Sequence, residues 1–292
     1  MTHVFMFTGK GGVGKTTCSA ATALYHADAG PTLAISTDAT PSLSHIFELA
    51  GRPQPAEVVP GLRIREIGET EVREMWDRKF GREVHEVFSA FVDIDYESFV
   101  EFMTSVLPGL GEEFMVDYIR ELALTGEYET IVWDTAPLGQ TLGLLETPAL
   151  LGNHLRMAPR IYSRLRLGRR SREPVLDILK RWEALSAENM EFLQNGVDFT
   201  MVTIPEALAV EQLAGVFHEM GKYGLSVKRI VVNNVIKTEE SEFTRTKARQ
   251  QRGYLEHIRT AYGHLKITEL PMFPQEVKGV ERLREIGKYL FA

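Results

Sequence analysis

The chain has 292 residues, of which 44% are hydrophobic and 25% are charged, a composition typical of a globular protein with a sizeable core. Its net charge of -7 excludes the basic field that drives sequence-independent binding to nucleic acid, so we expect no nucleic-acid partner. Its single cysteine, Cys18, excludes an intrachain disulfide and a thiolate metal cage built within one chain.

The first residues, MTHVFMFTGKGG, lack the basic segment and long apolar stretch that mark a secretory signal. No uninterrupted apolar run of about 18 residues, the length that spans a membrane, occurs in the sequence. We therefore expect a cytoplasmic protein that is neither exported by a standard signal nor membrane-spanning. Peripheral contact with a membrane stays compatible with this sequence.

Short apolar runs rich in β-branched residues recur along the chain, and helical patterns separate them. This alternation predicts an α/β fold in which a mostly parallel sheet is flanked by helices on both faces. Ligands of such sheets bind at the carboxyl ends of the strands. We expect strands at residues 3–9, 32–37, 62–67, 130–135, 198–204, 228–235 and 266–272.

The first predicted strand leads directly into a phosphate-binding motif. Gly9, Gly14, Lys15 and Thr16 complete the pattern G-x-x-x-x-G-K-[ST], and a helical pattern follows. In such a loop, glycines let backbone N–H groups wrap the phosphates, the lysine reaches the β- and γ-phosphates, and the hydroxyl binds Mg²⁺ directly. The expected nucleotide-binding residues of the loop are Gly9, Lys10, Gly11, Gly12, Val13, Gly14, Lys15, Thr16 and Thr17.

Two aspartates lie at the carboxyl ends of predicted strands, and we expect these strand ends to lie beside the loop. Asp134 ends the apolar part of strand 130–135 and is a candidate for holding Mg²⁺ through a water molecule. Asp38 follows strand 32–37 and is a candidate for orienting or deprotonating the water that attacks the γ-phosphate. On local pattern alone, Asp134 also fits a turn residue, and Asp38 fits a turn or a helix N-cap.

Two stretches interrupt the alternation of strands and helices, at residues 68 to about 127 and 142 to about 197. Both have the pattern of helices, and in EVREMWDRKFGREVHEVFSAFV apolar residues recur at three- and four-residue spacing. Because the two stretches flank strand 130–135, we expect them to form one helical subdomain. The whole chain, residues 1–292, is then a single P-loop domain with this insertion.

Seven segments of the sequence occur in a characteristic order. They are GKGGVGKTT, STDATPSLSHIF, LPGLGEEF, DTAPLGQTLGLLETP, VTIPEALAVEQ, IVVNNVI and PQEVKGVERL. Their order resembles that of the ArsA/Get3 family, which contains arsenite pump-driving ATPases and factors that target tail-anchored membrane proteins. The resemblance runs from Gly9 to about Leu283 and implies a dimeric, deviant P-loop ATPase of the SIMIBI type, with ATP and Mg²⁺ as cofactors.

This resemblance also implies roles for individual residues. STDATPSLS is similar to the first switch, with Asp38 as its catalytic aspartate, and DTAPLGQT to the second switch, which begins at Asp134. Glu206 resembles the nucleotide-binding glutamate of the family, and Asn233 resembles its adenine-reading asparagine. Read without the family, Glu206 equally fits a helix N-terminus, and Asn233 equally fits a turn or cap.

Lys10 is one lysine more than a phosphate-binding loop needs, because Lys15 already serves the phosphates of its own site. On local sequence alone, Lys10 fits a solvated loop residue. In the family that the chain resembles, the equivalent lysine reaches across a two-fold interface to the nucleotide of the other subunit, as an arginine finger does. The resemblance therefore implies a homodimer in which Lys10, Lys15 and Asp38 serve catalysis.

The two switches depart from the family pattern. Ala39, Thr40 and Pro41 follow Asp38, whereas the family pattern continues with Pro-Ala-His. Gln140 stands where the targeting factors have a histidine, which keeps hydrogen bonding but removes titration near neutral pH. We expect contacts between the switches to differ accordingly.

The zinc motif of the targeting factors, C-x-x-C followed by R-x-x-x-Q, is also altered. Ser241 and Thr244 align with the cysteines, Lys247 with the arginine and Gln251 with the glutamine. Hydroxyls are poor zinc ligands, so we expect a dimer without a zinc clasp. Arsenite sites need several thiols, which Cys18 alone does not supply, and we expect Cys18 to be a small buried residue.

The targeting factors hold an apolar helix in a groove built from their inserted helices. Flexible methionines and large aromatic side chains suit such a surface, although the same stripe also fits a helical core. The candidate groove residues are Met75, Phe88, Phe91, Phe99, Phe102, Met103, Val106, Leu107, Phe114, Met115, Met157 and Met190.

A basic run, RIYSRLRLGRRSR, extends from Arg160 to Arg172 in this acidic chain. It fits a contact with an acidic partner or an anionic membrane, a lid over phosphate, or a solvated helix face. The sequence leaves these alternatives open.

Together these features predict an ATP-hydrolysing dimeric switch, a Get3-like targeting factor that binds the hydrophobic segment of a tail-anchored membrane protein. An ArsA-like ATPase that drives arsenite or anion efflux is the alternative within the family. A MinD/ParA-like positioning ATPase is an alternative outside it. A small-molecule P-loop kinase and a binding module without hydrolysis fit parts of the same evidence.

Overall fold

The structure is a computed structural model that describes residues 2–37, 42–89, 93–100, 110–135 and 175–292. The chain divides into two compact units. The sheet unit consists of Met1–Ile67, Leu122–Leu142 and Gly196–Ala292, and the helical unit consists of Gly68–Glu121 and Gly143–Asn195. Asp38 to Pro41, Gln140, Phe91, Phe102, Met103, Val106, Leu107, Met157 and the basic run 160–172 lie outside the described residues.

The sheet unit is built on an eight-stranded sheet with the order β3-β4-β2-β5-β1-β6-β7-β8. All neighbouring strands are parallel except β3, which pairs antiparallel with β4. The predicted α/β fold with a mostly parallel sheet is therefore confirmed. The strands are β1 (His3–Gly9), β2 (Thr32–Ser36), β3 (Ala56–Val59), β4 (Leu62–Glu66), β5 (Thr130–Asp134), β6 (Val197–Thr203), β7 (Val227–Val235) and β8 (Lys266–Pro271).

Strand β3 at the edge of the sheet was not among the expected strands. It is only four residues long, too short to show an alternating pattern. A two-residue turn, Pro60 and Gly61, connects it to β4, and Gly61 adopts a φ of 86°, which favours glycine. The Pro-Gly pair was the available signal for this hairpin.

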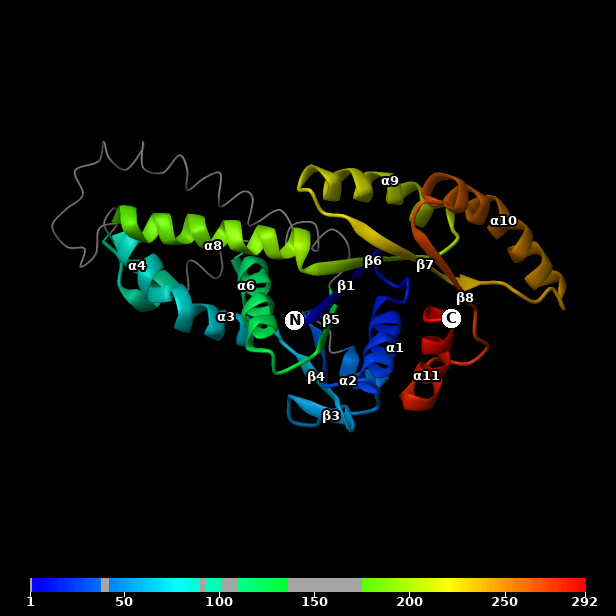
Figure 1. Cartoon of the computed structure of the whole chain (residues 1–292), viewed down its shortest axis with the longest axis horizontal. Coiled ribbons are helices and arrows are strands. Elements are labelled where there is room, and N and C mark those ends of the chain that lie inside the picture. Colours follow the sequence, from blue (N-terminus) through cyan, green and yellow to red (C-terminus); the bar gives the residue numbers. More distant parts are fainter. Residues whose placement is uncertain (1, 38–41, 90–92, 101–109, 136–174) are drawn as a thin grey trace. The chain divides into compact units, whose positions relative to one another are not determined.

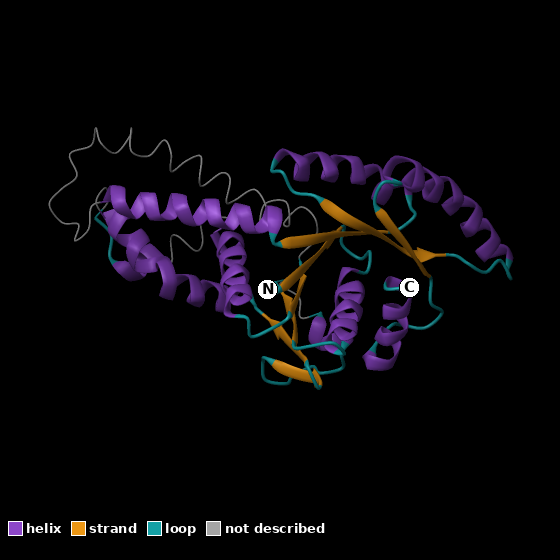
Figure 2. Cartoon of the chain, in the orientation of Figure 1, coloured by secondary structure: helices purple, strands orange, loops and turns teal. Residues whose placement is uncertain are grey.

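Helices cover both faces of the sheet (Figures 1 and 2). On one face α1 packs against α11, where Tyr25 and Phe291 stack with ring centroids 3.8 Å apart. On the other face α9 lies beside α10, where Phe217 and Tyr262 stack at 4.6 Å. The helices of this unit are α1 (Lys15–Ala27), α2 (Leu43–Ile46), α9 (Ala207–Lys222), α10 (Glu242–Tyr262) and α11 (Gly279–Leu290).

The described part of the helical unit contains helices and no strand (Figure 2). Phe99, Phe114 and Met115, three of the candidate groove residues, are buried here. Phe99 contacts the His85 ring and Phe114 the Phe80 ring, so both aromatic residues pack as core. The elements include α3 (Glu69–Trp76), the π-helix η1 (Asp77–Gly81), α4 (Arg82–Ser89), α6 (Leu110–Thr125) and α8 (Val175–Asn195), and residues 96–100 are also helical.

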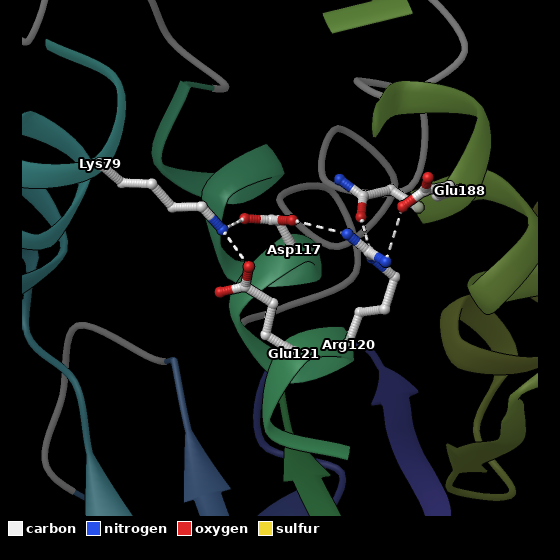
Figure 3. Close-up of polar contacts among 6 residues, drawn as sticks. Lys79, Asp117, Arg120, Glu121 and Glu188 are labelled. Carbon is white, nitrogen blue, oxygen red and sulfur yellow. Dashed lines mark hydrogen bonds and ion pairs between the residues drawn. The ribbon is translucent and has the colours of Figure 1, made fainter. Parts of the chain in front are cut away.

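An ion-pair network connects three elements of the helical unit (Figure 3). Lys79 of η1 pairs with Asp117 and with Glu121 on α6. Arg120, also on α6, contacts Asp117 at 3.2 Å and reaches Glu188 on α8 at 2.9 Å. Asp117 is 1% exposed, so this carboxylate lies buried between two cations.

None of the helices in the described ranges is both long and apolar enough to cross a bilayer.

Candidate functional site

The loop between β1 and α1 places three glycines, Gly9, Gly12 and Gly14, at a positive φ, and at Gly9 and Gly14 a neighbouring strand also occupies the space of a side chain. Gly9 has a φ of 153°, and a Cβ added there would lie 2.2 Å from the Val202 carbonyl oxygen of β6. Gly14 has a φ of 97°, and its Cβ would lie 2.3 Å from Nδ2 of Asn233. The Val202 contact is with backbone, so β6 requires glycine at position 9 as well as the loop conformation does, whereas a Cβ at Gly14 would have to displace the Asn233 amide.

Helix α1 begins directly after this loop, with Gly14 as its N-cap residue. Glycine has no side chain to cap the helix, and the first turn carries no acidic residue. The N–H groups of this turn and the positive end of the helix dipole are therefore available to an anion such as a phosphate group.

Lys15 and Lys10 differ in their environments. Lys15 is only 7% exposed, and its Nζ donates to the Lys10 carbonyl oxygen at 3.4 Å, so its side chain folds over the loop. Lys10 is exposed, and no ion pair joins it to a carboxylate within the described ranges of the chain. Lys15 is thus placed to serve this loop, whereas Lys10 is exposed to solvent and its role stays a prediction.

Thr16 and Asp134 meet across the site. The Thr16 hydroxyl donates to Oδ2 of Asp134 at 2.8 Å. Asp134 ends β5, is 1% exposed, and pairs in register with Phe7 on β1 and Ser36 on β2. A hydroxyl and a carboxylate side by side at the end of a phosphate loop are the oxygen donors that Mg²⁺ prefers, so these residues fit the predicted metal.

Strand β2 ends beside Asp134, two residues before the predicted catalytic Asp38. The Thr37 backbone N–H donates to the Asp134 carbonyl oxygen at 3.2 Å, and the Thr37 hydroxyl accepts from the Trp133 indole at 3.2 Å. The last described residue before Asp38 is therefore bonded to β5 at the site. Asp38 itself lies outside the described residues, and its role stays a prediction.

Asn233 lies in β7, and Glu206 follows the neighbouring strand β6. Asn233 reaches the loop, where its Nδ2 donates to the Val13 carbonyl oxygen at 2.9 Å. Glu206 is the exposed N-cap residue of α9, and its side chain makes no capping hydrogen bond. The structure therefore joins Asn233 to the loop, while Glu206 lies at the same carboxyl edge of the sheet without a described contact to the loop.

Ser241, Thr244 and Gln251 have structural roles that the sequence did not reveal. Ser241 and Thr244 form a reciprocal capping box at the start of α10. Gln251 accepts from the Ile236 N–H at 2.8 Å and donates to the Asn234 carbonyl oxygen at 3.0 Å, which ties α10 to the end of β7. The only available signal for Gln251 was its place in the family motif.

Cys18 is fully buried beneath the loop, as expected. Burial raises the pKa of its thiol to about 12, because desolvation disfavours the thiolate. The thiol is therefore protonated at neutral pH and is a poor metal ligand.

Comparisons with known proteins cover nearly the whole chain. The family model described as Anion-transporting ATPase matches residues 2–292. The chain is 31% identical to ATPase GET3A of Arabidopsis thaliana, over 94% of this chain and 80% of that protein. It is 29% identical to a protein of Aquifex aeolicus provisionally named arsenical pump-driving ATPase 2, over 99% of both chains. It is 28% identical to ATPase GET3 of Komagataella phaffii, over 97% of this chain and 88% of that protein.

Proposed function

The chain belongs to the anion-transporting ATPase family, which includes both GET3 and arsenical pump-driving ATPases, and from this premise we propose that it is a homodimeric, ATP-hydrolysing switch. The observation that carries the proposal is the hydrogen bond of 2.8 Å between Thr16 and Asp134 beside the glycine-rich loop. It joins the hydroxyl that follows the phosphate-binding lysine to a buried carboxylate on the adjacent strand. Phosphoryl transfer needs this kind of positioned, charged site.

The residues of the site have distinct tasks in hydrolysis. The loop N–H groups and Lys15 hold the β- and γ-phosphates of ATP. Thr16 and Asp134 would hold Mg²⁺, Thr16 as a direct ligand and Asp134 through water, and the metal would supply positive charge that offsets the charge of the phosphate oxygens. Asp38 orients the attacking water from the far side of the γ-phosphate. Glu206 and Asn233 complete the nucleotide site, with Asn233 on the adenine.

Lys10 supplies the argument for a homodimer. An exposed lysine in the loop, without a carboxylate partner in the described part of the chain, has its charge available for a phosphate outside its own site. A two-fold axis would give each subunit the Lys10 of the other. The added positive charge stabilises the transition state of hydrolysis, as an arginine finger does.

The client of the switch is a hydrophobic helix, most directly the anchor of a tail-anchored membrane protein. Support comes from the family resemblance, from the GET3-named relatives and from the methionine- and phenylalanine-rich inserted helices. Because Phe99, Phe114 and Met115 are buried, a groove that uses them requires the helical unit to rearrange. Nucleotide-driven movement of these helices would couple ATP to client binding.

Co-purification with a co-expressed tail-anchored substrate tests the targeting proposal. We expect a complex with the wild-type chain and a more persistent one with Asp38→Asn, which should bind ATP without hydrolysing it. The same substrate with charged residues placed in its anchor serves as the control and should not co-purify. Failure to isolate a complex with either chain would rule out targeting.

Efflux of arsenite is the second candidate function, because the Aquifex aeolicus relative carries a pump-driving name. This function predicts stimulation of ATP hydrolysis by arsenite. The buried, protonated Cys18 thiol argues against such a site, since arsenite requires several thiolates. Stimulation of the wild-type chain by arsenite that is lost in Cys18→Ala would favour a pump over a targeting factor.

The basic run 160–172 is the candidate for peripheral contact with a membrane. Reversing the charges of Arg166, Arg169 and Arg170 should weaken binding to anionic liposomes and leave ATP turnover unchanged. Unchanged liposome binding would leave the run as a solvated face of a cytoplasmic protein.

A further inference from the structure

Asn233 touches the phosphate loop itself. Its Nδ2 donates to the Val13 carbonyl oxygen at 2.9 Å, and the same nitrogen occupies the space that a Cβ on Gly14 would need. Val13 and Gly14 directly precede Lys15 and the first turn of α1. A side chain from β7 therefore supports the backbone that presents the phosphate-binding groups.

The chemistry of the amide allows this contact and base recognition at the same time. A carboxamide Nδ2 carries two hydrogens and its Oδ1 carries two lone pairs. One hydrogen is used on Val13, which leaves the second hydrogen and Oδ1 for the N7 and N6 edge of an adenine, the pairing that asparagine makes with this base. One side chain can thus hold the loop and read the base together.

Hydrogen bonds from α10 hold the end of β7 that carries Asn233. Asn234 adopts a left-handed φ of 58°, at an irregularity where the register of β7 against β8 shifts. Gln251 of α10 is 8% exposed and spans this irregularity, bonded to the Asn234 carbonyl oxygen and to the Ile236 N–H. These contacts limit the positions that Asn233 can adopt against Val13.

We propose that Asn233 is a positioning residue for phosphate binding and hydrolysis, in addition to its role toward the base. It holds the Val13–Gly14 backbone so that the loop N–H groups and Lys15 converge on the phosphates, and Gln251 holds Asn233 in turn. This inference rests on the proposed ATPase function. It adds that the loop depends on Asn233 even when no base is bound.

A ligand without a base separates the two roles. We expect Asn233→Ala to weaken binding of magnesium tripolyphosphate, measured by calorimetry, by about tenfold, the loss of one hydrogen bond. Asn233→Asp keeps the shape of the side chain but has no N–H to donate, and it should show at least the same loss. With ATP as substrate, both variants should show a lower kcat and a higher KM than the wild type.

Gln251→Ala should shift tripolyphosphate binding in the same direction by a smaller factor. Gln250→Ala changes the exposed neighbour on α10 and is the matched control, with binding equal to that of the wild type. Near-equal thermal midpoints for all four variants would show that unfolding does not account for the losses.

The outcomes distinguish this proposal from the function on which it rests. If both Asn233 variants bind tripolyphosphate as the wild type does and only the KM for ATP rises, Asn233 reads the base alone and the positioning role is overturned, while the ATPase stands. If the wild-type chain neither binds tripolyphosphate nor hydrolyses ATP, both proposals are overturned.

Discussion

The Thr16 hydroxyl on α1 donates to the buried carboxylate of Asp134 at the end of β5, 2.8 Å away. In the sequence these residues are 118 positions apart. The parallel sheet brings them together, because β5 lies beside β1 and both strands end at the same edge. The following predictions test what this arrangement does.

Asp134→Asn should weaken the effect of Mg²⁺ on ATP binding. Removing a charged outer ligand typically costs about 10- to 100-fold in metal affinity. Titrating Mg²⁺ into the chain with a fluorescent ATP analogue measures this loss. Asp198→Asn on β6 replaces an exposed aspartate and should leave the titration unchanged. Equal magnesium dependence in wild type and Asp134→Asn would remove Asp134 from the metal site.

Gly14→Ala should reduce ATP affinity by about tenfold or more. The left-handed φ of 97° costs an alanine about 1–2 kcal/mol, and the new Cβ would displace Asn233. Gly215→Ala in α9 is the control, since a Cβ there meets nothing within 4 Å, and alanine favours a helix. We expect Gly215→Ala to raise the free energy of unfolding slightly and to bind ATP normally. Normal binding by Gly14→Ala would refute the glycine requirement.

Asp117→Asn should destabilise the helical unit. The change removes the buried carboxylate between Lys79 and Arg120, although Glu121 and Glu188 still neutralise these cations in part. We therefore expect a loss of about 1–3 kcal/mol in urea unfolding followed by circular dichroism. Glu121→Gln, which alters a half-exposed member of the same network, should cost less than about 1 kcal/mol. Equal losses of unfolding free energy in the two variants would show that the burial of Asp117 does not increase its contribution to stability.

Cys18 should make stability depend on pH in the alkaline range. The folded-state pKa of its thiol, about 12, lies above the value of about 8.5 expected in the unfolded chain. This difference favours the folded state fully below about pH 8.5, and the advantage disappears as pH rises toward 12. Between about pH 8 and about pH 10, the free energy of unfolding should therefore fall more in the wild type than in Cys18→Ala. Identical slopes would contradict the burial of the thiol.

Much of the fold could be predicted from sequence because the buried parallel strands are continuous apolar runs. TIVWD at β5, for example, is buried at every position. The phosphate-binding loop could also be predicted from sequence, because phosphate chemistry sets its residue types and its place between a strand and a helix. The sequence could not show that Val202 makes Gly9 obligatory or that Asn233 supports Val13. Both contacts depend on the order of strands in the sheet, which local pattern does not encode.

The packing of the helical unit was harder to predict from sequence, for a different reason. An apolar stripe on a helix looks the same whether it faces a core or a client, and Phe99 and Phe114 prove to be buried. The network around Asp117 joins residues from separate helices, so no spacing in the sequence marks it. Ser241 and Thr244 align with the cysteine metal ligands of the targeting factors, and in this structure they form a capping box at the start of α10.

The central claim, a homodimer whose subunits share catalytic groups, is tested most directly by mixing two inactive chains. Lys10→Ala lacks the lysine donated to the partner, and Asp38→Asn lacks the aspartate used at its own site. In a mixed dimer, the site of the Lys10→Ala subunit keeps its own Asp38 and receives Lys10 from the other subunit. We predict that ATP turnover reappears on mixing, up to about half the wild-type rate per mixed dimer, because one of its two sites is complete. If turnover stays at the level of the separate variants after the subunits have exchanged, Lys10 does not act across a dimer and the account is contradicted.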